Sequence, residues 1–267
     1  MYDFELVRPS SIAEAVKALG GEDAQPISGG QTLLPTMKQR LARPERLVSL
    51  GGIGEMRYVR REGGALVIGG GTVHAAVARE AADAFPGLAS LAARIGDPAV
   101  RNRGTIGGSL ANNDPSACYP AAALATGATI VATGPGGARE IAADDYFDGM
   151  FGTALEENEI VTEVRLPIPE ASAYEKFIQP ASRFALVGVF VARYADGVRV
   201  AVTGASNDGV FRWSEAEAAL ASDFSAESVR ALEAPDAADM IADLHGPATY
   251  RAHLVKVLTG RAVQRAG

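Results

Sequence analysis

The stretch ISGGQTLL at residues 27–34 decides how the N-terminal part of the chain is built. An apolar run ends in two glycines that form a turn, and the spacing of apolar residues after them predicts a helix over Leu33–Leu41. Short alternating segments at Phe4–Val7 and Arg46–Leu50 predict strands before and after it. Residues 1–52 are therefore expected to form one small α+β subdomain.

A second α+β subdomain is expected over residues 53–170. Strand-like apolar runs lie at Ala65–Ile68, Ala128–Thr133 and Ile160–Leu166. A helix is predicted over Leu88–Ile95. The passage Gly96–Pro120 that follows is polar and rich in glycine, so we expect an irregular binding loop there.

Residues 171–267 have the pattern of a separate α+β domain. Two apolar strands, Phe184–Tyr194 and Val198–Thr203, are joined by Ala195-Asp196-Gly197, which is typical of a hairpin turn. Helical patterns follow at Ser214–Ala221, Ala226–Leu232, Ala237–Leu244 and Ala248–Leu258. The fold class is therefore α+β throughout.

Composition and charge exclude several classes of function. The net charge of −7 and a pI near 5.1 argue against a nucleic-acid partner, because binding a polyanion needs a basic stripe. The chain shows no secretory leader and no run of about 18 apolar residues, so membrane insertion is not expected. We expect a cytoplasmic protein.

Few residues in this chain are able to ligate a metal. Cys118 is the single cysteine, which excludes an internal disulfide and cannot by itself hold an iron-sulfur cluster. His74, His245 and His253 lack the spacing of a metal site, and His74 is expected to be a surface or capping residue. Redox chemistry would therefore have to come from an organic cofactor.

Two passages have the composition of an anion-binding site, residues 27–34 and RNRGTIGGS at residues 101–109. Each sets paired glycines beside small hydroxyl residues, so that several backbone N–H groups can point into one concavity, as protein binds a pyrophosphate. Arg101 and Arg103 would add positive charge. The alternative is that both passages are tight turns that bind nothing, and neither has the spacing of a Walker A or GxGxxG motif.

Three longer segments carry a resemblance to a known family. They read SGGQTLLPTMKQRLARPERLVSL, VRNRGTIGGSLANNDPSACYPAAALATGATI and YEKFIQPASRFALVGV. In this order and at these distances they resemble the FAD-binding medium subunit of the carbon monoxide dehydrogenase and xanthine dehydrogenase family, the molybdenum hydroxylases. The resemblance extends from about residue 3 to residue 260.

The resemblance implies a specific fold. Residues 1–170 would form a vanillyl-alcohol-oxidase (PCMH)-type FAD-binding domain of two α+β subdomains, about 1–52 and 53–170. Residues 171–267 would form a C-terminal α+β domain like that of the carbon monoxide dehydrogenase flavoprotein, a small antiparallel sheet with helices. FAD would lie between the two subdomains, with its pyrophosphate on the two glycine passages.

The resemblance also implies which residues contact FAD, and it implies no catalytic acid or base and no metal ligand in this chain. The residues assigned to the cofactor are Ile27, Ser28, Gly29, Gly30, Gln31, Thr32, Leu33, Leu34, Ile95, Thr105, Ile106, Gly107, Gly108, Ser109, Cys118, Ile160 and Ile178. A side chain introduced at Gly107 would face the pyrophosphate. Two positions depart from the family pattern: Cys118 stands where many relatives have Asp, and Ile178 where many have Lys or Arg.

By the same resemblance, the chain is an electron-transfer subunit of a multi-subunit enzyme. A large subunit would carry molybdopterin and a small subunit two [2Fe-2S] clusters, possibly in a doubled heterotrimer. Electrons would pass from the clusters through FAD to a final acceptor, NAD or quinone. Two alternatives remain at this point: a flavin-free assembly or binding protein of the same fold, and a free-standing flavin oxidase.

Overall fold

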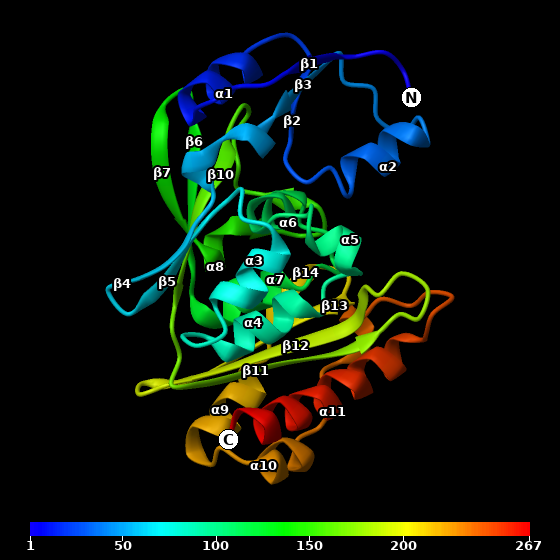
Figure 1. Cartoon of the computed structure of the whole chain (residues 1–267). Coiled ribbons are helices and arrows are strands. Elements are labelled where there is room, and N and C mark those ends of the chain that lie inside the picture. Colours follow the sequence, from blue (N-terminus) through cyan, green and yellow to red (C-terminus); the bar gives the residue numbers. More distant parts are fainter.

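The computed structural model describes all residues, Met1–Gly267, and has a layered architecture. Figure 1 shows a small N-terminal unit at the top, a middle unit with a sheet on one side and helices within, and a second large sheet backed by C-terminal helices. No helix combines the length and the apolar character needed to cross a bilayer.

The N-terminal unit is a parallel sheet with two helices. It consists of β1 (Glu5–Val7), α1 (Ile12–Leu19), β2 (Ala24–Ile27), α2 (Leu33–Lys38) and β3 (Arg46–Ser49), with strand order β1-β3-β2. α1 begins at Ile12 because the Ser11 side chain accepts a hydrogen bond from the Glu14 N–H. α2 ends three residues before the predicted Leu41, and Arg40 then takes a left-handed φ of 63°.

The middle unit is built around an antiparallel sheet with strand order β4-β5-β10-β6-β7. Its strands are β4 (Val59–Glu62), β5 (Ala65–Gly69), β6 (Thr129–Gly134), β7 (Gly137–Ala142) and β10 (Ile160–Pro167). Its helices are α3 (His74–Glu80), α4 (Pro86–Ala93), α5 (Pro98–Arg101), α6 (Ile106–Asn112), α7 (Tyr119–Thr126) and α8 (Ala143–Tyr146), and β8 (Phe147–Asp148) pairs with β9 (Gly152–Thr153). Two short 3-10 turns, Leu50–Gly52 and Gly54–Met56, connect this unit to the first.

The prediction of an irregular loop over Gly96–Pro120 is wrong, because most of that passage is helical. Asp97 and Thr105 each cap a helix by accepting a backbone N–H, from Val100 and Gly108. Gly107 and Gly108 lie within α6, where Gly107 packs against the backbone of Gly70, whereas Gly96 and Gly104 lie in the connections between helices. Sequence patterns also missed α7, because it is buried on all sides and has no polar face.

The C-terminal unit is a four-stranded antiparallel sheet with order β11-β12-β13-β14. Its elements are β11 (Ala171–Ile178), β12 (Ala185–Tyr194), β13 (Gly197–Ser206), β14 (Gly209–Arg212), α9 (Ser214–Ser222), α10 (Ala226–Ala231) and α11 (Ala248–Ala266). The predicted hairpin is confirmed, with Tyr194 paired to Gly197 across its turn. The predicted helix Ala237–Leu244 is wrong: only the 3-10 turn Ala237–Asp239 forms, and Leu244 is 90% exposed.

This second sheet is covered on both faces. Phe190 and Ala192 of β12 face the helices of the middle unit, whereas Val189 and Val191 face the core under the C-terminal helices. α4 and α7 pack on one side and α11 on the other. A strand buried on both faces has no polar alternation, which explains the continuous apolar sequence of β12.

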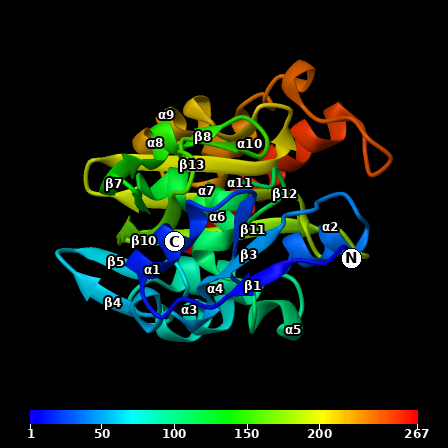
Figure 2. The ribbon, with the colours of Figure 1, turned by 90° about the horizontal axis from the view of Figure 1, so that it is seen from above.

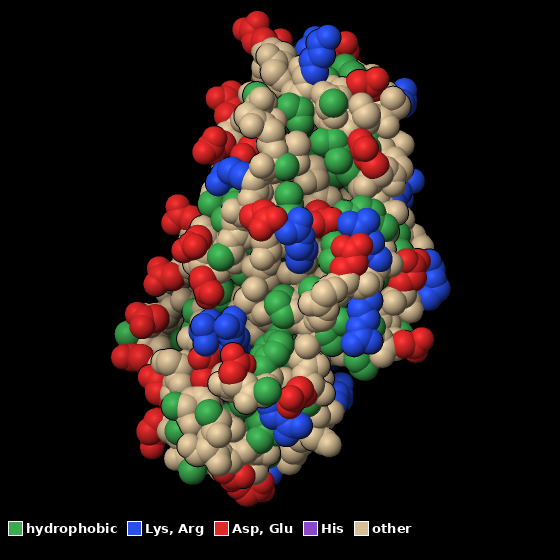
Figure 3. All heavy atoms as spheres, turned by 90° about the vertical axis from the view of Figure 1, so that its left-hand side faces the viewer, with side chains coloured by type: hydrophobic (Ala, Val, Ile, Leu, Met, Phe, Trp, Pro, Cys, Tyr) green, Lys and Arg blue, Asp and Glu red, His purple; other side chains and the backbone are tan.

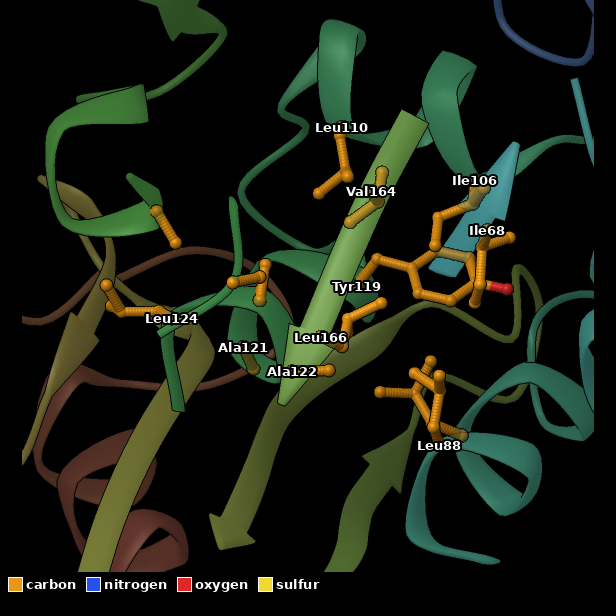
Figure 4. Close-up of a cluster of buried hydrophobic side chains, with 14 of the residues drawn as sticks. Ile68, Leu88, Ile106, Leu110, Tyr119, Ala121, Ala122, Leu124, Val164 and Leu166 are labelled. Atoms are coloured by element: carbon orange, nitrogen blue, oxygen red, sulfur yellow. The ribbon is translucent and has the colours of Figure 1, made fainter. Parts of the chain in front are cut away.

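The central core lies where α6 and α7 pack against the five-stranded sheet. Figure 4 shows Tyr119 of α7 pointing among Ile68, Ile106 and Val164. All four side chains are at most 1% exposed. Ile106 thereby anchors the first turn of α6, and with it the second glycine passage.

The outer face of the five-stranded sheet carries paired charges. Glu163 receives hydrogen bonds from Tyr58 and from Arg165 at 2.5 and 2.6 Å, and Arg60 lies 3.4 Å away. Figure 3 shows acidic and basic side chains interspersed over this side of the molecule. This face is therefore a network of ion pairs and not a patch of one sign.

Arg251 connects α11 to the sheet, and its removal is expected to destabilise the chain. Its side chain, 3% exposed, donates to the carbonyls of Leu186 and Gly204 and to Asp243 Oδ2, each at 2.7 Å. Because Arg251→Met would leave buried acceptors without a donor, we expect the free energy of unfolding to fall by about 3 kcal/mol in urea denaturation. Arg261→Met, at an exposed position of the same helix, is the control. Equal losses in both variants would contradict this role.

Candidate functional site

A cavity of about 540 Å³ lies where the N-terminal unit, the helices of the middle unit and the start of β12 meet. The loop after β2 forms one wall, and the turns before α5 and α6 form a second. Lys176 of β11 and residues 182–184 form a third. Figures 1 and 2 agree in placing α2 and α5 on the same side of the molecule.

The loop after β2 presents backbone donors that have no partner in the chain. None of the N–H groups of Gly29, Gly30, Gln31 and Thr32 donates to a backbone carbonyl. Gly30 has a φ of 69°, a conformation that a glycine adopts without strain. Four consecutive unpaired donors lining a cavity are suited to an anion.

Two loops far apart in the sequence are held together behind these donors. A Cβ atom at Gly29 would lie 2.2 Å from the Arg103 carbonyl oxygen and 2.6 Å from Gly104 Cα. Ser28 Oγ and Thr105 Oγ1 are hydrogen-bonded at 2.8 Å. The close approach therefore needs glycine at position 29, and the two walls of the cavity meet at this contact.

The second passage differs from expectation, because most of its N–H groups already donate to other atoms of the chain. The N–H of Ile106 bonds to the Thr72 carbonyl at 3.1 Å, and the N–H of Gly107 to the Gly70 carbonyl at 2.9 Å. The Gly108 N–H bonds to Thr105 Oγ1 at 3.2 Å. A Cβ at Gly107 would meet the Gly70 oxygen at 2.6 Å, so a side chain introduced there would point at packed backbone, although Gly107 itself lines the cavity.

Most residues singled out from the sequence line this cavity. They are Ile27, Ser28, Gly29, Gly30, Gln31, Thr32, Leu33, Ile95, Thr105, Gly107, Gly108, Ser109, Cys118 and Ile160. Leu34, Ile106 and Ile178 do not line it. Leu34 packs beside Gly30, and Ile106 is buried in the core.

Ile178 lies outside the cavity, next to an irregularity in the pairing of β11 with β12. In a regular strand residues two apart point to the same face, so Lys176 and Ile178 would point together. The pairing of β11 with β12 shifts between Phe177 and Ile178, and Ile178 is 43% exposed while Lys176 is buried. A bulge of this kind leaves no clear pattern in the sequence.

Lys176 and Cys118 meet at the cavity wall, and the sequence pattern had not singled out Lys176. Lys176 Nζ donates to the Arg183 carbonyl at 2.9 Å and lies 3.6 Å from Cys118 Sγ. Arg101, expected to add charge to the site, instead donates to the Ile95 and Gly96 carbonyls and does not line the cavity. Arg103 does not line it either.

The acids at the cavity have defined partners. Glu159 is bound to Arg139 at 2.7 and 2.8 Å, and these hydrogen bonds lower the pKa of Glu159. Burial raises the pKa of Asp114, although its carboxylate accepts the Ser116 N–H at 2.8 Å. No group of three or more His, Cys, Asp or Glu side chains has a metal-binding arrangement.

His74 is buried, which corrects its predicted surface position. It is 4% exposed and lines the cavity. Its ring lies beside that of Tyr119, with 5.3 Å between the ring centroids and an angle of 47° between the ring planes. Burial, followed by the positive charge of Arg101, lowers the pKa of His74 to about 4. The imidazole is therefore neutral near pH 7.

The chain is similar to a known protein family over most of its length. Residues 2–169 match the family described as "FAD binding domain in molybdopterin dehydrogenase". The carbon monoxide dehydrogenase medium chain of Afipia carboxidovorans is 37% identical, with 98% of this chain and 96% of that chain covered. The nicotine 6-hydroxylase medium subunit of Paenarthrobacter nicotinovorans is 35% identical, with 97% and 95% covered.

The solved structures agree with this similarity. Carbon monoxide dehydrogenase from Hydrogenophaga pseudoflava superposes with a TM-score of 0.90 at 39% identity, covering 98% of this chain and 96% of that one. The fold is that of a medium chain of a molybdenum-containing dehydrogenase. The chain belongs to the family of FAD-binding domains in molybdopterin dehydrogenases, a family of oxidoreductases, and the predicted family, α+β fold class and cofactor are confirmed.

The low pKa of His74 predicts an acid-sensitive stability. Between about pH 4 and pH 6.5 the unfolded chain binds the proton that the folded chain does not, so stability falls as the pH falls through this window. We expect His74→Gln to flatten the stability curve there by up to about 1.4 kcal/mol per pH unit. His253→Gln, at an exposed position, should keep the wild-type slope. Urea denaturation at several pH values measures this, and an unchanged slope in His74→Gln would refute it.

Gly108 offers a sharper test of the anion site than Gly107. A Cβ at Gly108 would meet only Thr105 Oγ1 at 3.0 Å and Ser28 Cβ at 3.7 Å. Gly108→Asp and Gly108→Asn have the same shape and differ in charge. We expect the Asp variant to bind FAD about tenfold more weakly than the Asn variant, because its carboxylate repels the pyrophosphate. Titration of FAD fluorescence measures both, and equal affinities would argue against an anion at this wall.

Proposed function

We propose that the chain holds FAD in this cavity and passes electrons from the [2Fe-2S] clusters of a partner subunit to a final acceptor, NAD or quinone. The observation that carries the proposal is the row of unpaired N–H groups from Gly29 to Thr32. They provide the donors that a pyrophosphate needs without any side-chain charge. The family match and the FAD-binding names of relatives support the choice of ligand.

The residues present fit a dinucleotide. The loop after β2 would hold the pyrophosphate, and Gly108 and Ser109 would lie beside it on the second wall. The cavity continues from there to Cys118 and to Lys176, which offers room for an extended ligand. We propose residues 1–170, in subdomains of about 1–52 and 53–170, as the FAD-binding domain. Residues 171–267 are proposed as a second domain, which contributes Lys176 and residues 182–184 to the cavity wall.

The remaining redox centres are proposed to lie on other chains. When bound, FAD supplies the two-electron and one-electron chemistry, and the protein supplies orientation and electrostatics. The chain has one cysteine, which is too few for an iron-sulfur cluster. Relatives named medium chain or medium subunit support partners of two kinds, a molybdopterin-containing large subunit and a [2Fe-2S] small subunit.

The absorption spectrum of the purified chain tests the proposal. We expect flavin bands near about 370 and 450 nm, one FAD per chain released by heat, and FAD uptake by the cofactor-free chain. Adding a reduced [2Fe-2S] partner subunit should bleach the band near about 450 nm, while substrates of the molybdenum centre alone should not. A chain that neither contains nor takes up FAD would instead be the flavin-free assembly protein.

A further inference from the structure

Lys176 is a buried cation for which the chain supplies no carboxylate. Its side chain is 5% exposed, and its partners are a carbonyl oxygen and the Cys118 sulfur. The acids closest in sequence or on the cavity wall are bound elsewhere. Glu175 pairs with Arg94 and Arg265, and Glu159 pairs with Arg139.

An unpaired buried charge is costly, because the group loses its hydration without gaining an opposite charge. Asp114, the other acid on the cavity wall, accepts the Ser116 N–H. Lys176 also lines the cavity, so a bound ligand is able to supply the missing negative charge. Cys118 and Lys176 therefore mark a part of the site that is suited to negative charge on the ligand.

The pyrophosphate is not the best candidate for this charge. Its donors lie on the loop after β2, in the N-terminal unit, whereas Lys176 belongs to β11 of the C-terminal sheet. Figure 1 shows these elements on opposite sides of the middle helices. The pyrophosphate of FAD carries two negative charges, and the flavin ring gains one more when it accepts two electrons and one proton, since one electron's charge is left uncompensated.

We propose that Lys176 is the counter-charge to the reduced flavin ring, and that Cys118 beside it, which offers no carboxylate, leaves the ammonium available for this role. The inference rests on the proposed function. Lys176 takes no part in proton transfer in this step, and the electrons come from the [2Fe-2S] partner, or from dithionite in the experiment. Lys176 is thus a positioning residue that favours the reduced state of the cofactor.

Two substitutions that remove the free charge by different means test the proposal in the full chain. Lys176→Met deletes the ammonium, and Cys118→Asp places a carboxylate beside it. Cys118→Asn is the control, because it has the shape of Asp without the charge. The measurements are the dissociation constant for oxidised FAD and the midpoint potential of bound FAD during dithionite titration.

We expect Lys176→Met and Cys118→Asp each to weaken binding of reduced FAD at least about tenfold relative to oxidised FAD, which lowers the two-electron potential by about 30 mV. Cys118→Asn should keep the wild-type potential.

An unchanged potential in Lys176→Met, or equal shifts in the Asp and Asn variants, would overturn the inference while FAD binding stands. If Lys176→Met does not fold, the Asp and Asn pair decides. Failure of the wild-type chain to take up FAD would contradict the proposed function itself.

Discussion

The contact between Gly29 and the backbone of Arg103 and Gly104 is the constraint on which the cavity depends. It brings the N-terminal sheet against the helices of the middle unit at a distance that no Cβ atom permits, and the Ser28–Thr105 hydrogen bond fixes its register. The two glycine passages have different tasks as a result. The first presents free N–H groups. In the second, Gly107 allows α6 to pack on Gly70, and the N–H groups of Ile106 and Gly107 donate to the carbonyls of Thr72 and Gly70.

The C-terminal sheet extends this arrangement through its buried strands. β12 has one face in the core around Tyr119 and the other under α11, so the wall that contains Lys176 is supported from both sides. Arg251 reaches through the second layer to carbonyls of β12 and β13. The position of Lys176 at the cavity therefore depends on packing among residues that never touch a ligand.

Sequence patterns recovered the elements whose local signals agree with their tertiary setting. The strand that begins at Ala65 and the hairpin between β12 and β13 are examples. The passage Gly96–Pro120 was misjudged because Gly107 and Gly108, which suggest a turn in the sequence, lie within α6, where Gly107 packs against the backbone of Gly70. At the site, the glycine motifs located the cavity, but the pairing irregularity beside the exposed Ile178 and the buried Lys176 depends on strand pairing, which no local pattern encodes.

The backbone donors of the first loop have a consequence for how the site is mapped by mutation. Gln31 and Thr32 contribute N–H groups that every residue except proline retains, so replacing their side chains by alanine leaves the donors in place. Replacing Gly29 disrupts the docking of two loops and registers as a loss of folding. An alanine scan would thus show little effect on binding at Gln31 and Thr32, whose N–H groups face the cavity, and a large effect at Gly29, whose close contact supports the loop. The measured effects would be the reverse of the roles proposed for these residues in recognition.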